Sequence, residues 1–212
     1  MTLQMILDSI GAWSSLRDNQ DATQINALFS VGNYFKYTRE TPKNLETEVG
    51  KIYYMHAYMG VFENKLKIFM IDAANDTQAQ YESPEGILPY ITVCSLHEET
   101  GNVGGEITKQ EAMLRIGAWN ADHETWIENK VETPENIFQA FAIPESDLHE
   151  GQQLKIYFAL KANPSPEIAS ADLVVVEKTG TSAKQVLYYD MVRPVPPFGS
   201  FAQSNFYLLE IS

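Results

Sequence analysis

The stretch KIYYMHAYMGVFENKLKIFMIDA, residues 51–73, decides the fold. It holds two runs rich in Ile, Tyr, Phe and Met, residues 51–59 and 66–73, which the polar connection Glu63-Asn64-Lys65 joins. Two such runs separated by a short polar link are typical of a β-hairpin. We therefore expect an antiparallel pair of strands here and a sheet as the scaffold of the protein.

Helical patterns lie on both sides of this hairpin. Apolar residues at spacings of three and four predict a helix over 3–16, and Asp21 is an N-cap for a second helix that extends toward residue 35. Thr108 and Glu111 have the spacing of a capping box before a helix over 109–119, and residues 122–131 either extend this helix or form a second piece. Thr133-Pro134 predicts a short helix that begins at residue 134 and ends before Pro144.

Apolar runs bounded by turn residues predict the remaining strands, at 87–96, 154–161, 171–177, 185–192 and 205–211. The sequence thus predicts an α+β protein with antiparallel sheets and with helices packed on one face.

Two short repeats suggest that the chain is doubled. IGAW occurs at 10–13 and at 116–119, and KIY occurs at 51–53 and at 155–157, so both are displaced by about half of the 212 residues. A duplication would give two similar halves, residues 1–106 and 107–212, each with helices followed by an antiparallel sheet. The alternative is two helix-then-sheet segments without a common ancestor, and the sequence leaves both open.

The charge of the chain limits its partners. Residues 1–106 carry 7 basic and 14 acidic side chains and residues 107–212 carry 8 and 14, which together give a net charge of −13. Nucleic acids and anionic membranes require a local cationic surface, and the sequence has none. No apolar run approaches the length of a membrane span. We therefore expect no nucleic acid and no membrane as partners.

The cysteine content and the first residues bear on the compartment. Cys94 is the single cysteine, so no disulfide within the chain is possible, and its apolar surroundings indicate a core residue. The first residues lack the basic start and continuous apolar run of a signal peptide, because Asp8 and Ser9 interrupt the apolar residues. We expect a cytoplasmic protein of bacterial type.

The first candidate site is an aromatic row on the hairpin. Side chains alternate along a strand, so Tyr54, His56 and Tyr58 share one face. Such a row, if exposed, stacks a sugar or heterocycle and gives His56 a role in proton transfer. The alternative is a strand covered on both faces, in which the row belongs to the core.

Carboxylates at the end of the hairpin are the second candidate. Asp72-Ala-Ala-Asn-Asp76 closes the second strand, and Asp72 would complete a His56/Asp72 pair for acid–base chemistry if the register allows. Carboxylates at this position are also common strand terminators.

Motifs for metals and cofactors are weak or missing in the sequence. Three histidines precede a glutamate, at positions 97, 123 and 149, but none has the spacing that places two metal ligands on one helix face. We expect no metal and no cofactor, because no nucleophile elbow, phosphate loop, dinucleotide fingerprint or CxxC occurs.

These patterns favour a protein that binds a protein partner, or forms a homodimer, without catalysis. Tyr, Phe, Met and Trp, which are enriched in interfaces, are abundant in the chain. The alternative is a small-molecule-binding or hydrolytic enzyme that uses the His56/Asp72 cluster.

Overall fold

The computed structural model describes residues 1–39, 52–98, 108–133, 136–149, 151–162, 169–179, 185–189, 192–195 and 206–212. The helices are α1 (Leu3–Asp18), α2 (Ala22–Phe29), α3 (Gln78–Tyr81), α4 (Lys109–Val131) and α5 (Tyr207–Glu210), with the 3-10 turns η1 (Leu88–Tyr90) and η2 (Glu145–Asp147). The strands are β1 (Tyr34–Thr38), β2 (Tyr54–Phe62), β3 (Lys65–Asp72), β4 (Thr92–His97), β5 (Ala140–Pro144), β6 (Gln153–Lys161), β7 (Ser170–Thr179), β8 (Gln185–Tyr189) and β9 (Arg193–Val195). None of these helices is long and apolar enough to cross a bilayer.

The expected hairpin is confirmed as β2 and β3, except that residue 51 lies outside the described residues. The two strands pair from Met55 with Asp72 to Phe62 with Lys65. Glu63 and Asn64 form the turn, and both have positive φ, 51° and 57°. Two central residues with positive φ give the turn whose twist matches that of the flanking strands, so the polar link fixes the register of the pair.

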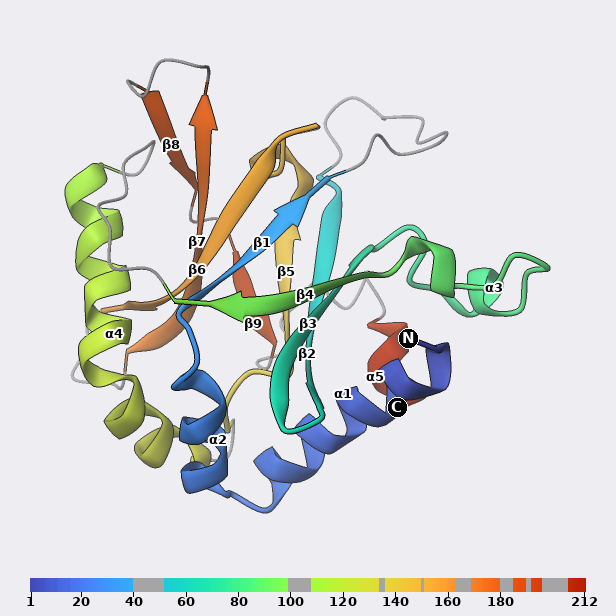
Figure 1. The fold of residues 1–212 in the computed structure, drawn as a ribbon, viewed down its shortest axis with the longest axis horizontal. Coiled ribbons are helices and arrows are strands. Elements are labelled where there is room, and N and C mark those ends of the chain that lie inside the picture. The colour runs from blue at the N-terminus through green and yellow to red at the C-terminus, as the bar shows by residue number, and fades with distance from the viewer. Residues whose placement is uncertain are drawn as a thin grey trace.

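The strands form one antiparallel sheet that curls back on itself. Its order is β8-β7-β6-β1-β4-β3-β2-β5-β9 over the part of the chain that the structure describes. The edge strand β9 lies against β7 near the opposite edge, so the sheet approaches a closed barrel. Figure 1 shows the hairpin near the middle of the sheet, with α4 beside β6 and β7 and with α1 across the hairpin.

The inner face of the curled sheet holds the largest apolar cluster. Met55, Ala57 and Met59 of β2 point into it, as do the alternate residues of the other long strands. Phe29, Trp119 and further aromatic residues from the helices pack into the same cluster. The buried thiol of Cys94 also lies there, as its apolar setting predicts.

The outer face of the sheet carries two smaller clusters. Ile6 and Ile10 of α1 cover Tyr58 and Phe69 together with α5, whereas Ala112 and Ile116 of α4 pack with residues of β6 and β7. The helices therefore contribute to the inner cluster and to both outer clusters. The α+β content and the antiparallel sheet are confirmed, and a single helical face is not.

The long helix predicted toward residue 35 is wrong. The helix α2 begins after its N-cap Asp21 but ends at Phe29. A Cβ on Gly32 would stand 2.4 Å from the carbonyl oxygen of His97, so only glycine permits this close approach to β4. The chain then continues as β1, which pairs with both β4 and β6.

Two short apolar segments also adopt the opposite structure from the one predicted. The helix expected from residue 134 to before Pro144 is wrong, because residues 140–144 form β5 between β2 and β9, and residues 134–135 lie outside the described residues. The strand expected over 205–211 is wrong, because residues 207–210 form α5, which packs on α1, and residue 205 lies outside the described residues. Periodicity alone does not distinguish a helix from a strand in runs of this length.

Strands from both halves of the chain lie side by side. The strand β2 pairs with β5, and β1 pairs with β6, so the sheet runs through residues 1–106 and 107–212 without a break in the pairing. The division at residue 106 stays a prediction, and residues 99–107 lie outside the described residues.

Candidate functional site

The aromatic row predicted on β2 is covered by the chain itself. Tyr54, His56 and Tyr58 do share the outer face of the strand, but His56 and Tyr58 have no exposed surface and Tyr54 is half-buried. The ring of Phe206 stacks on the imidazole of His56 with centroids 4.0 Å apart and planes 21° apart. The place where a flat ligand would stack on His56 is therefore filled by the C-terminal segment.

A buried carboxylate holds this row in place. Asp76 has no exposed surface, and its Oδ2 lies 2.5 Å from Nδ1 of His56 and accepts a hydrogen bond from the hydroxyl of Tyr58. Its Oδ1 accepts a hydrogen bond of 3.3 Å from the backbone N–H of Leu208. We call His56, Tyr58 and Asp76 the Asp76 cluster. It ties β2, the segment after β3 and α5 to one another.

Burial and the neighbouring Asp76 carboxylate raise the pKa of Tyr58 well above its usual range. The phenol therefore remains a neutral hydrogen-bond donor at physiological pH. Nε2 of His56 is buried and has no hydrogen-bond partner among the described residues. The cluster is suited to holding three segments together, since solvent does not reach its polar atoms.

The predicted pair of His56 with Asp72 does not form. Asp72 is opposite Met55 in the β2–β3 register, whereas His56 is opposite Ile71, so the two side chains point to opposite faces. Asp76, four residues later, provides the carboxylate instead. The sequence contained this signal in the second aspartate of residues 72–76, but only the path of the chain after β3 brings it to His56.

Asp72 belongs to a separate group at the inner face. Arg39 donates from its guanidinium to the carboxylate of Glu145 and to the carbonyl oxygens of Glu145 and Leu148, the last two at 3.3 Å. Asp72 interacts with Glu145 through a side-chain hydrogen bond. Sequence analysis missed Arg39 and Glu145, because no local pattern relates positions so far apart along the chain.

The two carboxyl groups of this group affect each other's ionisation. Burial, followed by the nearby Asp72, raises the pKa of Glu145 to about 7, while the Arg39 guanidinium opposes the shift. Burial also raises the pKa of Asp72, but the hydrogen bond from Glu145 favours its ionised form. The hydrogen bond between the two carboxyl groups thus favours the proton on Glu145 over the proton on Asp72. We call Arg39, Asp72 and Glu145 the acid pair group.

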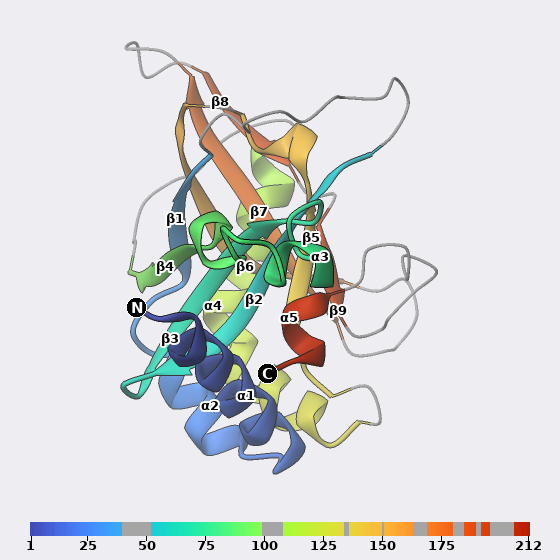
Figure 2. The ribbon, with the colours of Figure 1, turned by 90° about the vertical axis from the view of Figure 1, so that its right-hand side faces the viewer.

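The segment from residue 73 to residue 91, which we call the arm, projects from the sheet between β3 and β4. It carries α3 and η1, and Figures 1 and 2 show α5 below it. Tyr81 of α3 is 41% exposed, and its ring meets that of Tyr207 of α5, with centroids 5.8 Å apart and planes at 63°. An aromatic pair of one exposed and one half-buried ring thus joins α3 to α5.

Two carboxylates act electrostatically on Tyr207. Burial raises the pKa of Tyr207, and the negative charges of Glu82 and Glu210 raise it further, together with Tyr81. Both glutamates are exposed. We call Tyr81, Glu82, Tyr207 and Glu210 the tyrosine face.

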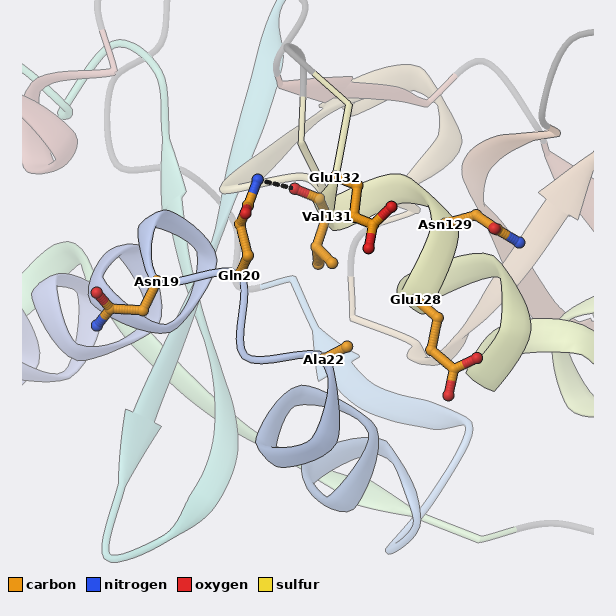
Figure 3. A pocket seen from close by; sticks show the side chains of 7 residues that line it. All are labelled: Asn19, Gln20, Ala22, Glu128, Asn129, Val131 and Glu132. Carbon is orange, nitrogen blue, oxygen red and sulfur yellow. Dashed lines mark hydrogen bonds between the residues drawn. The ribbon is translucent and has the colours of Figure 1, made fainter.

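A polar pocket of about 580 Å³ lies between the ends of α1 and α4 and the start of α2. Figure 3 shows Gln20 reaching across it, where its Nε2 donates a hydrogen bond of 2.9 Å to the carbonyl oxygen of Val131. Glu128 and Glu132 are exposed side chains of its wall. The pocket is open to solvent, and the hydrogen bond from Gln20 to Val131 joins two of its walls.

The histidines considered as metal ligands have other neighbours. Nδ1 of His123 donates a hydrogen bond of 3.0 Å to the carbonyl oxygen of Trp119, His149 pairs with Glu177, and the ring of His97 lies against Tyr34. In the residues that the structure describes, no group of three His, Cys, Asp or Glu side chains is arranged to hold a metal ion.

Comparison of the chain with protein-family models, with curated proteins and with solved structures finds no match.

Proposed function

We propose that this protein works by binding another protein through the tyrosine face, without catalysis. The observation that carries the proposal is the contact of the exposed Tyr81 with the half-buried Tyr207, whose helix α5 is bonded to the fully buried Asp76. Tyrosine is enriched in protein interfaces, where it combines a large apolar ring with a polar tip.

The arm is held in one conformation before any partner arrives. The hydroxyl of Thr77 caps α3 by accepting a hydrogen bond of 3.1 Å from the N–H of Gln80. The Gln80 side chain then donates to the carbonyl oxygen of Gly86 at 2.8 Å, which closes the turn after α3. Asp76, directly before this cap, fastens the arm to β2 and α5. Preorganisation of this kind reduces the entropy lost when a surface binds.

The charges on this surface favour a different protein over a second copy. Residues 68–98 and 206–212 contain no Lys or Arg, whereas they contain Glu82, Glu85 and Glu210. A twofold dimer through the tyrosine face would place these carboxylates near their own copies, and like charges opposed across an interface cost free energy. These charges favour a different protein as the partner, and the homodimer is the alternative.

Capture from a lysate of the source organism, followed by reconstitution with the purified partner, tests this function. We expect the wild type to bind a partner protein that the Tyr81→Ala variant does not bind. The matched control is Leu114→Ala, which removes an apolar side chain that is even more exposed, at 62%, from helix α4. Equal retention by both variants would contradict the proposal, and sedimentation showing a dimer that Tyr81→Ala dissolves would replace it by self-association.

The acid pair group supports a second candidate, a hydrolytic enzyme that uses Asp72 with Glu145 in place of His56. Two carboxyl groups that share one proton can activate water, with the ionised member as base and the protonated member as acid. The specific observation is that Glu145, whose pKa burial raises to about 7, forms a side-chain hydrogen bond with Asp72. Hydrolysis of a fluorescent casein substrate between pH 5 and pH 7 tests it; turnover that Asp72→Asn leaves unchanged would exclude these residues.

Two finer points from the sequence stay proposals. A common origin of the two halves is supported by the repeated IGAW, because Ile10 and Trp13 of α1 and Ile116 and Trp119 of α4 are all buried. An alignment of relatives tests this common origin. Halves that are no more similar to each other than shuffled sequences would refute it. A cytoplasmic location is supported by the buried free thiol of Cys94, and fractionation of the source cells tests it.

A further inference from the structure

We propose that the tyrosine face is a subsite for a cationic side chain, the guanidinium of an arginine in a basic segment of the partner protein. This inference rests on the proposed binding function and specifies the chemistry of the partner.

The aromatic pair offers ring surface to a cation. Tyr81 and Tyr207 meet edge to face, and the 41% exposure of Tyr81 leaves part of its ring open to solvent. The face of an aromatic ring is electronegative and attracts a cation placed over it. Lys155 uses this interaction elsewhere in the chain, where its Nζ lies 5.1 Å from the centroid of the Tyr34 ring. At the tyrosine face, neither flanking segment has a basic side chain to fill this role.

The surrounding carboxylates add to this attraction. Glu82 and Glu210 are both exposed, and the negative charges of both act on the phenol of Tyr207. A third carboxylate, Glu85, accepts a hydrogen bond of 3.0 Å from the hydroxyl of Tyr90 in the same arm. The face therefore presents two acids near its rings and a third in the arm, and an anionic ligand would be repelled.

Arginine fits this arrangement better than lysine or a metal ion. A guanidinium is planar, so it can stack on Tyr81 and donate two parallel hydrogen bonds to one carboxylate at the same time. An ammonium makes only a point contact and is more strongly hydrated. A metal ion would need several oxygen ligands converging on one point, and no such group occurs among the described residues.

Binding of a labelled hexa-arginine peptide, measured by fluorescence anisotropy at about 0.15 M salt, tests the inference. We expect the dissociation constant to rise roughly 3-fold for Tyr81→Leu and roughly 3-fold for Glu82→Gln, given the usual strength of exposed cation–π contacts and ion pairs. The matched control is Glu128→Gln, which removes the same charge from the wall of the polar pocket. We expect no change for this control and weaker binding of hexa-lysine to the wild type.

The outcomes separate this inference from the function on which it rests. If Glu128→Gln weakens binding of hexa-arginine as much as Glu82→Gln does, the net negative charge of the protein attracts the peptide. That result would refute the subsite. If hexa-arginine does not bind while Tyr81→Ala still abolishes partner capture, the binding function stands and the cationic subsite falls. If neither peptide nor partner depends on Tyr81, both fall.

Discussion

Replacing Glu145 by glutamine will remove a pH dependence of stability that the fold creates. Burial and the neighbouring Asp72 raise the pKa of Glu145 from its ordinary value of 4.5 to about 7 in the folded protein. Between these values the folded chain holds a proton that the unfolded chain releases. The associated stability is therefore fully present below pH 4.5 and is lost as the pH rises to 7.

The size of the effect follows from the shift. A difference of 2.5 pKa units at about 1.36 kcal/mol each gives an upper limit of about 3 kcal/mol. The Glu145 side chain is only 12% exposed, so solvent screens little of it. Glutamine reproduces the protonated carboxyl, because its amide donates to Asp72 and its carbonyl accepts from Arg39. We expect wild type and Glu145→Gln to be equally stable at pH 4.5, and the variant to be more stable at pH 8 by up to about 3 kcal/mol.

Urea denaturation at pH 4.5, 6, 7 and 8 measures this difference for wild type, Glu145→Gln and the exposed control Glu128→Gln. The control corrects for the lower net charge of the variant. The free energy of unfolding of wild type and of Glu145→Gln is then compared across the pH range. Parallel profiles from pH 4.5 to 8 would refute the raised pKa of Glu145.

Three further changes test the packing that supports the site. Asp76→Asn should lower the free energy of unfolding by about 3 kcal/mol in urea denaturation, because a buried acceptor of three hydrogen bonds is lost; the exposed Asp18→Asn should have no effect. Gly60→Ala should lower the free energy of unfolding by about 1–3 kcal/mol in the same assay, because a Cβ would stand 2.5 Å from the ring of Phe69. Gly117→Ala, with open space around it, should raise the free energy of unfolding by about 0.5–1 kcal/mol. The thiol of Cys94 should resist Ellman's reagent in the folded protein, since it is 4% exposed and burial raises its pKa to about 12; rapid labelling would contradict its place in the core.

Local chemistry made much of the fold predictable. The turn at Glu63 and Asn64, the cap at Thr108 and the strands β6 and β7 were all predicted from neighbouring residues, and the structure confirms each. The errors fall on the short apolar segments that became β5 and α5. Their own sequences permit either structure, and contact with β2 or α1 decides between them.

The sequence did not show which residues of the candidate sites meet, because the partners are separated along the chain. Sequence analysis selected His56 and considered both aspartates of residues 72–76, but it paired His56 with Asp72 by proximity in sequence. The register of β2 and β3 turns those two side chains to opposite faces. The arm brings Asp76 back to His56, and Glu145 reaches Asp72 from the second half of the chain.

By itself the sequence determined the hairpin, the antiparallel α+β content and the acidic charge of the surface, because these follow from residue type and from periods of two to four residues. Only the tertiary structure decided that Phe206 covers His56, that the ring of Tyr207 meets that of Tyr81, and that Asp72 forms a side-chain hydrogen bond with Glu145. Each of these contacts joins segments that are distant in the sequence. Burial and strand pairing over the whole chain select such contacts, and no local pattern encodes them.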